Sequence, residues 1–535
     1  MTNDSMAPFG IQVPDSCELA KLTDSSVDLP TFGGRLDARW EPGARITSVG
    51  GPAHFAMFLK NTGLFDRLCE DFPLCHTSDN ACSKRGILGT AILAILLGKA
   101  RCAHINAIRF DVAAKKLPDL DEIVSEDTVR RAFRGGDEKR LDSWLLKHGK
   151  EVFVSLLSYR CILDVDNAVK PTYGHQEGAE VGYNPVKPGR PSHNCHSYFI
   201  GSTRISLGVD VLPGKQHAGG CGMPRLWALI GSLPQQLWPT LLRGDVGHGN
   251  DAIMREAGSR GIRHLFKTKR SRRMQALFKR LADSRKRSGC GSGWKSHKME
   301  LRLDGWERMR RVLFIRRPAE RKAEAVEQKP RGRKPGVPKT SAAPVPAVPA
   351  GVRQTEFEFA KDMKGREWDC CILVTNGTGL DATAISRLYR DRGDCENSFD
   401  EFKNQWGWAG FTTRKTKSCR VMARLIAIVA NWWNVFMRLA DPTAHREAVT
   451  SRPAYMGIMG RIVESARRRL ICLTSTHAEA AQIRQALDKV AAFFRWLKSN
   501  AEQLTSERRW MLILRYAFRN LILPEQPSTA LMPIR

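Results

Sequence analysis

The sequence lacks any apolar run long enough to cross a membrane. The longest candidates are residues 87–98 and 425–437. The first falls short of the roughly 18 residues that a spanning helix needs. The second is interrupted by two Asn and two Trp. We therefore expect both to be buried helices. The N-terminus also lacks the basic-then-apolar pattern of a signal peptide, which favours an intracellular location.

Paired metal-binding cysteines are missing as well. The chain has 14 Cys, but none is spaced C-x2-C, so no zinc ribbon or finger is expected. Three cysteines between residues 69 and 82, and the group His193, Cys195 and His196, are better explained as reduced structural residues than as metal ligands. No Walker phosphate loop occurs either, so ATP is not implied.

Acidic residues are scarce relative to basic ones. The sequence has 55 Asp and Glu against 85 Lys and Arg, a net charge of +30 with a pI near 9.9. Residues 255–334 alone carry 27 Lys and Arg against 8 Asp and Glu, a net charge of +19. Such an excess is unusual for a metabolic enzyme and predicts a polyanionic partner. Nucleic acid is favoured over a membrane surface.

What is present is a polar, charged stretch at residues 388–403, L-Y-R-D-R-G-D-C-E-N-S-F-D-E-F-K. Four of its residues share one helical face, at offsets 0, 3, 7 and 14: Tyr389, Arg392, Glu396 and Lys403. A carboxylate among two cations and a phenol suits an anionic partner that also needs a metal, although a solvated amphipathic helix remains the alternative. Gly393 predicts a break, after which the helix would restart with Asp394 as its cap.

Residues 160–270 show the element order of an RNase H-like fold. We expect three strands, a helix, a strand, a helix and a strand, at 161–169, 197–203, 204–212, 225–237, 238–244, 251–260 and 261–268. In such a fold, acidic residues lie at the first and fourth strands. Between the first two strands, residues 173–193 are polar and rich in Gly and Pro, which indicates a long loop.

A family resemblance follows from these segments. Y-x2-R-x3-E-x6-K is the signature of bacterial insertion-sequence transposases with an Asp-Asp-Glu (DDE) triad, and residues 389–403 match it without a gap. The loop at 173–193 closely resembles the one that follows the first catalytic Asp in one branch of that family. Together the resemblance covers most of residues 160–270 and 385–410.

The resemblance implies a catalytic triad of Asp166, Asp245 and Glu396. For the first position Asp164 remains an alternative. The family pattern favours Asp166, although an Asn follows it where Ser or Thr is usual. Asp245 ends its strand before a Gly-rich loop, as suits an exposed ligand; a turn-capping role is the alternative, and Asp251 is a weaker substitute.

Three carboxylates suit two divalent cations about 3.5–4 Å apart, because hard cations prefer oxygen ligands. We expect Mg²⁺, with Mn²⁺ as a substitute. The resemblance implies that Arg392 and Lys403 hold DNA phosphates and that Tyr389 positions the strand end. Trp294 and Trp306 could receive a flipped base, but core packing explains each more simply.

The expected fold class is α/β: an RNase H-like catalytic core with a β-rich insertion subdomain, flanked by helical N- and C-terminal regions. The expected divisions are a mostly helical DNA-binding region (1–150, with an irregular lead-in or a short arm to about 45), the first part of the core (155–270), the basic insertion with a disordered loop at 320–351 (271–380), the catalytic helix (381–415) and a helical C-terminal region (416–535). A helix opened by Ser125 suits either DNA reading or an ordinary bundle.

The sequence thus predicts a DNA transposase that binds terminal inverted repeats, cleaves at the element ends and joins the 3′-OH ends to target DNA. A homodimer is expected, since two ends must be held together. The location would be the cytoplasm, on the nucleoid. The alternatives are a non-catalytic DNA-binding descendant of such an enzyme and an RNase H-like nuclease that cuts without joining.

Overall fold

The computed structural model describes residues 26–522, apart from 283–287, 319–357, 362–366 and gaps of one or two residues. The loop expected at 320–351 lies outside the described residues. Within them, no helix is long and apolar enough to cross a bilayer.

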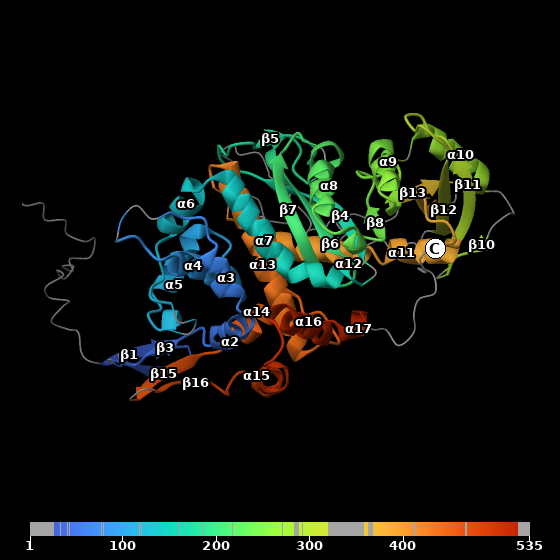
Figure 1. Cartoon of the computed structure of the whole chain (residues 1–535). Coiled ribbons are helices and arrows are strands. Elements are labelled where there is room, and N and C mark those ends of the chain that lie inside the picture. Colours follow the sequence, from blue (N-terminus) through green and yellow to red (C-terminus); the bar gives the residue numbers. More distant parts are fainter. Residues whose placement is uncertain are drawn as a thin grey trace, which may run out of the picture.

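A five-stranded unit forms the centre of the molecule (Figure 1). Its strands are β4 (Ile162–Pro171), β6 (Pro191–Ile200), β7 (Ile205–Pro213), β8 (Leu241–Gly244) and β9 (Arg263–Lys267). They lie in the order β9-β8-β4-β6-β7; β8 runs parallel to β4 and β9, and β6 is antiparallel to β4 and β7. With α8 (Met223–Gly231) and α9 (Asp251–Ser259), this is the predicted RNase H-like order.

Element boundaries differ from the prediction at two places. β6 begins at Pro191 rather than at 197, because its polar residues His193, Asn194 and His196 are buried between neighbouring strands. α8 ends at Gly231 rather than at 237, and Pro234 follows shortly after. Proline cannot extend a helix, since it lacks an amide hydrogen.

The strands of the β-rich basic insertion extend the central sheet. Its elements are α10 (Arg272–Ala282), β10 (Ser288–Gly289), β11 (Lys295–Leu301), β12 (Arg310–Pro318), β13 (Glu358–Lys361) and β14 (Glu367–Thr375). β14 pairs with β9, and β5 (Glu180–Val181) lies at the far edge, so the described residues build one 11-stranded sheet. Figure 1 shows the insertion as the yellow-green end of the molecule.

Helix α13 (Thr416–Ala440), the first helix of the C-terminal region, packs against the core. It packs against β7 and against α7 (Glu138–Leu157). Its two buried amides are bonded to backbone: Asn431 receives the Ser206 N–H and donates to the Ser206 carbonyl at 2.9 and 2.7 Å, and Asn434 donates to Thr203 at 2.9 Å. Burial of these polar groups is tolerated because they are hydrogen-bonded.

The N- and C-terminal regions form one unit. The N-terminal helices are α2 (Pro52–Thr62), α3 (Leu64–Glu70), α4 (Lys84–Leu96), α5 (Ile105–Arg109) and α6 (Glu126–Gly135); the C-terminal ones are α14 (Ala448–Met456), α15 (Ala480–Ala501), α16 (Ser506–Ala517) and α17 (Arg519–Ile522). Strand β3 (Ile46–Thr47) pairs with β15 (Gly460–Ser465), which pairs with β16 (Arg468–Leu473). The C-terminal region is thus mainly helical, as predicted, with one hairpin of β15 and β16 between α14 and α15.

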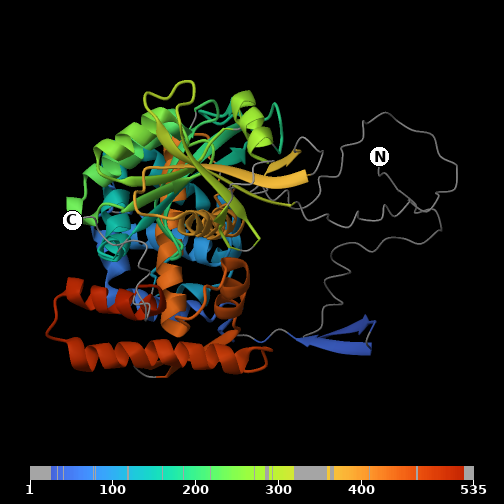
Figure 2. The ribbon, with the colours of Figure 1, turned by 90° about the vertical axis from the view of Figure 1, so that its right-hand side faces the viewer.

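Residues up to about 45 were expected to be an irregular lead-in or a short arm, and the described part of this region contains a hairpin of β1 (Ser26–Thr31) and β2 (Gly34–Arg39). Figure 2 shows this hairpin, in blue, projecting away from the body. In the helical part, Ser125 caps α6 as predicted, accepting the Thr128 N–H at 3.2 Å. The preceding long helix α4 is buried from Gly86 to Leu96, which favours a bundle role for it.

Candidate active site

The signature stretch folds as two helices and a wide turn. α11 (Ala382–Arg390) ends before residues 391–392, α12 (Gly393–Asp400) follows, and η5 (Glu401–Gln405) is a π-helical turn. The break predicted at Gly393 is confirmed, but the cap was wrong: Arg392 precedes the helix, and Asp394 instead pairs with Arg204 at 2.8 Å. This break separates Tyr389 from the face that carries Glu396.

The structure distinguishes between the two aspartates of β4. Asp164 forms a two-pronged ion pair with Arg243, at 2.7 Å for both contacts, and both side chains are only 1% exposed. Arg243 also donates to the carbonyl of Leu388, so this pair anchors α11 to the sheet. Asp164 is thus committed to a structural contact, which leaves Asp166 as the carboxylate at the site.

Arg392 bridges two of the three candidate carboxylates. Its Nη2 lies 2.7 Å from Asp166 Oδ2, and its Nη1 lies 2.9 Å from Glu396 Oε1. The guanidinium is 2% exposed, whereas the side chains of Asp166 and Glu396 keep 18% and 35% of their surface. One buried cation therefore draws β4 and α12 together, with both carboxylates facing partly outward.

Asp245 follows β8 and lies near this pair. Its Oδ1 accepts the Gly247 N–H at 2.9 Å and faces His248 Nδ1 at 2.8 Å. Its charge interacts with those of Asp166 and Arg392. Asp251 is held elsewhere, by Arg310 at 2.6 Å, so it does not replace Asp245. The three candidate carboxylates thus come from β4, the loop after β8, and α12.

The pKa values of Asp166 and Asp245 are shifted in opposite directions. Burial, with a smaller contribution from Asp245, raises the pKa of Asp166 to about 6, although Arg392 opposes the shift. Burial also opposes ionisation of Asp245, but the hydrogen bond and charge of His248, together with Arg392, outweigh it and lower its pKa below the ordinary value. Neighbouring carboxylates whose pKa values separate in this way are typical of functional sites.

A chain of buried side chains behind Asp245 was missed by sequence reasoning. His248 Nε2 lies 3.2 Å from His196 Nε2, and His196 Nδ1 lies 3.1 Å from the hydroxyl of Tyr198. Tyr198 donates to Asp210, which Arg424 of α13 holds at 2.6 Å. When neutral His248 carries its proton on Nδ1, it donates to the carboxylate of Asp245, and its Nε2 then accepts the proton shared with His196. His196 was noticed in the sequence only as a member of a local His and Cys group.

The donor set fits a hard divalent cation. Three carboxylates face one guanidinium, which leaves an excess of two negative charges among these four groups. His248 and Gly247 both bond to Oδ1 of Asp245, which orients Oδ2 for other contacts. As placed, however, no three His, Cys, Asp or Glu side chains among the described residues are arranged to hold a metal, because Arg392 lies between two of the acids.

The other signature residues lie differently from the prediction of one shared face. Tyr389 is 1% exposed and packs in a core cluster with Leu241, Leu265 and Trp294. Lys403 lies half-buried in η5. Trp294 and Trp306 are 3% and 7% exposed, in agreement with the core role. The structure therefore brings the acids and Arg392 together, but leaves Tyr389 inside the core.

Comparison with known proteins locates this site within a family domain. The family model described as "Transposase DDE domain" matches residues 158–432, slightly more than half of the 535-residue chain. No curated protein is detectably similar in sequence. Among solved structures, the cryo-EM structure of the piggyBac transposase synaptic complex with hairpin DNA aligns with a TM-score of 0.38 and 10% identity, over 88% of this chain and 86% of that one. The matched domain contains β4, β8 and α12 together with the three acids, and the chain belongs to the family of transposases with a DDE domain.

Proposed function

We propose that this protein is the transposase of a bacterial insertion sequence. It binds terminal inverted repeats, cleaves DNA at the element ends and joins the 3′-OH ends to target DNA. The observation that supports this most is the convergence of Asp166, Asp245 and Glu396 around Arg392 from segments far apart in the chain. Asp166, Asp245 and Glu396 are the proposed catalytic and metal-binding residues, and the proposed cofactor is a pair of Mg²⁺ ions, for which Mn²⁺ substitutes.

The chain's own groups prepare the site for this chemistry. Asp166, Asp245 and Glu396 would hold the ions, which when bound activate the attacking oxygen and stabilise the leaving one. Arg392 keeps the acids close together by offsetting their repulsion. His248 holds Asp245 in one orientation.

DNA contacts are proposed for the remaining signature residues. Lys403 is half-buried in η5, directly after the helix α12 that carries Glu396, and would contact a phosphate as a point charge. Arg392 would reach DNA phosphates only by exchanging one of its carboxylate partners. Tyr389 would support the DNA strand end indirectly, because its ring is packed in the core and its hydroxyl interacts with the charge of Arg392.

The partners follow from charge and reaction. A net charge of +30 favours DNA binding across several surfaces, including the N-terminal region 1–150 and the insertion 271–380. Two copies of the chain would hold the two element ends, in a synaptic homodimer on the nucleoid.

The test is cleavage of end-labelled DNA that flanks the coding region, in the presence of Mg²⁺. The variants Asp166→Asn, Asp245→Asn and Glu396→Gln are expected to lose cleavage while retaining DNA binding. The control Asp488→Asn changes an exposed carboxylate on α15 and is expected to cleave normally.

Three outcomes would redirect the proposal. Full cleavage by the Glu396→Gln protein would remove the assignment of the triad, and binding without any nicking by the unmodified protein would indicate a non-catalytic descendant. Cleavage without joined product in a strand-transfer assay would indicate a nuclease.

A further inference from the structure

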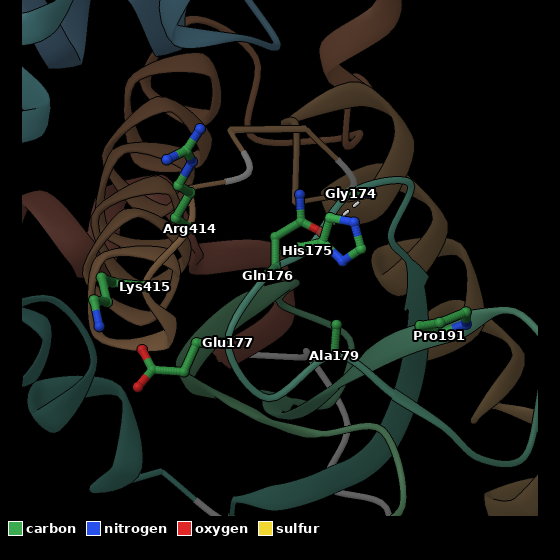
Figure 3. Close-up of a pocket in the computed structure, with 8 residues that line it drawn as sticks. All are labelled: Gly174, His175, Gln176, Glu177, Ala179, Pro191, Arg414 and Lys415. Carbon is green, nitrogen blue, oxygen red and sulfur yellow. Dashed lines mark hydrogen bonds between the residues drawn. The ribbon is translucent and has the colours of Figure 1, made fainter.

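An open pocket lies at the end of β4, beyond the candidate active site (Figure 3). It has a volume of about 520 Å³, and its walls come from two segments: the loop after β4, including His175 and Gln176, and the turn before α13, with Arg414 and Lys415. The two segments are more than 220 residues apart in the chain. Nothing in the proposed roles of the triad accounts for this pocket.

Glu177 fixes the two walls to each other. Its amide donates to the carbonyl of Arg414 at 2.9 Å. Its own carbonyl accepts the hydroxyl of Thr416 at 2.6 Å, and its carboxylate accepts the Thr416 N–H at 3.1 Å. Three hydrogen bonds across one junction hold the pocket in a defined shape. The carboxylate of Glu177 is engaged in this junction, so it serves to build the pocket.

Two exposed cations and one exposed carboxylate, that of Glu177, line the pocket, and the carboxylate is already hydrogen-bonded to Thr416. Arg414 and Lys415 are exposed, and in the part of the chain that the structure describes neither has an acidic partner within ion-pair distance. In Figure 3, Arg414 lies on the side of Gln176, and Lys415 lies on the side of Glu177. A preformed pocket with exposed cations and polar side chains suits an anion with several oxygen acceptors.

The same loop carries two more ordered cations next to the pocket. Tyr173 is 66% exposed, and its ring centroid lies 4.8 Å from Lys187 Nζ and 4.6 Å from Arg190 Cζ. Cation–π contact restricts both long side chains, so less entropy is lost when they meet a ligand. Tyr173 and Arg190 directly adjoin the pocket residues Gly174 and Pro191 in the chain.

Strand β4 connects the pocket to the candidate active site. Asp166 and Lys170 lie on the same face of β4, four residues apart, which corresponds to about 13 Å along a strand. Lys170 donates to the carbonyl of Gly410 at 2.7 Å and thereby ties β4 to the segment that leads into Arg414. A polymer with a phosphate at the triad would pass this pocket within a few nucleotides.

We propose that the pocket between residues 173–191 and 414–416 binds the phosphodiester backbone of the DNA strand that flanks the cleavage position. Arg414 and Lys415 contact phosphates inside the pocket, and Lys187 and Arg190 contact the next ones along the strand. The inference rests on the proposed function, because it takes the triad as the place where the strand is cut.

The experiment compares Arg414→Ala/Lys415→Ala with the control Arg495→Ala/Lys498→Ala. The control removes the same charge from exposed positions of α15, at the other end of the molecule (Figure 1). Binding is measured by fluorescence anisotropy with a labelled duplex of the DNA that flanks the coding region, without divalent metal, over a series of salt concentrations. The pocket variant is expected to lower the slope of log affinity against log salt by about 2, since each phosphate contact contributes about 0.9. The control is expected to leave it unchanged.

Equal slopes for the pocket variant, the control and the unmodified protein would overturn the proposal. Cleavage by the unmodified protein is assayed in parallel. If it cleaves with Mg²⁺ while the slopes are equal, the pocket inference alone fails; if it binds with a pocket-dependent slope but never cleaves, the transposase proposal fails and the pocket remains a DNA site.

Discussion

Replacing His248 by Phe tests how the structure prepares Asp245 for a cation. The side chain of His248 is 1% exposed and lies between Asp245 Oδ1, at 2.8 Å, and His196 Nε2, at 3.2 Å. Phenylalanine fills a similar volume but offers neither nitrogen. In the variant, Oδ1 of Asp245 keeps only the hydrogen bond from the Gly247 N–H, and His196 Nε2 is left buried without its partner.

The expected magnitude follows from the lost hydrogen bond. A hydrogen bond to a charged group contributes about 1.5–3 kcal/mol, which corresponds to roughly 10- to 100-fold in metal affinity. The shift in protonation acts in the same direction. His248 lowers the pKa of Asp245 against the effect of burial, so its removal raises that pKa and favours the protonated acid, which binds metal poorly. Stability should also fall by about 1–3 kcal/mol, because of the unpaired imidazole nitrogen.

The assay separates metal binding from catalysis and from folding. Mn²⁺ binding is followed by electron paramagnetic resonance, and cleavage is measured across a Mg²⁺ series. We expect the half-saturating metal concentration to rise about 10- to 100-fold, with most of the rate recovered at saturation and metal-free DNA binding unchanged. His264→Phe is the matched control, because His264 is equally buried on β9 and packs on Phe266 rather than on Asp245. A folded His248→Phe protein with the metal dependence of the control would refute the reasoning.

Three further predictions concern the buried acids. Asp164→Asn should lower the free energy of unfolding by about 3–5 kcal/mol in urea titrations, because it leaves Arg243 buried without its charge partner; Asp166→Asn should cost much less. Apparent metal affinity, measured calorimetrically, should rise about tenfold per pH unit up to about pH 6 and then level off. The reason is the raised pKa of Asp166, because protons compete with the cation for this carboxylate below that pH. Glu401 has a lowered pKa, since its bonds to His445, Ala448 and Arg204 outweigh burial. The stability that its carboxylate contributes should therefore be complete above its ordinary pKa and be lost as pH falls. Glu401→Gln should weaken this pH dependence in acid-unfolding curves. Acid-unfolding curves of Glu401→Gln that superpose on those of the unmodified protein would contradict the last expectation.

Local patterns predicted the elements of the core well. The alternation of β4, the apolar character of α13 and the Ser125 cap depend on residues within a few positions of each other, so the sequence contains the whole signal. The predicted order of strands and helices in the core follows for the same reason. Gly393 indicated the break between α11 and α12 because a missing side chain weakens a helix wherever it occurs.

Long-range pairing was not visible in the sequence. The strands of the insertion showed their alternation, but the pairing of β14 with β9 depends on contacts between segments more than 100 residues apart. The sheet of β3 with β15 is a stronger case, since two residues near the N-terminus complete a hairpin near the C-terminus. Short strands such as β3 carry too little pattern to be recognised without their partners.

The sequence by itself determined which residues have the chemistry for this site: one acid within a predicted strand, one at the end of another, and one within a helix, beside an arginine. Only the tertiary structure decided which acid has which partner. Asp164 and Asp166 have equal local claims, and they are distinguished by Arg243, 79 residues away, and by Arg392, 226 residues away. The histidine chain behind Asp245 likewise joins residues 52 positions apart. The physical reason is that a carboxylate's protonation and availability depend on the charges within a few ångströms, and folding alone sets which charges those are.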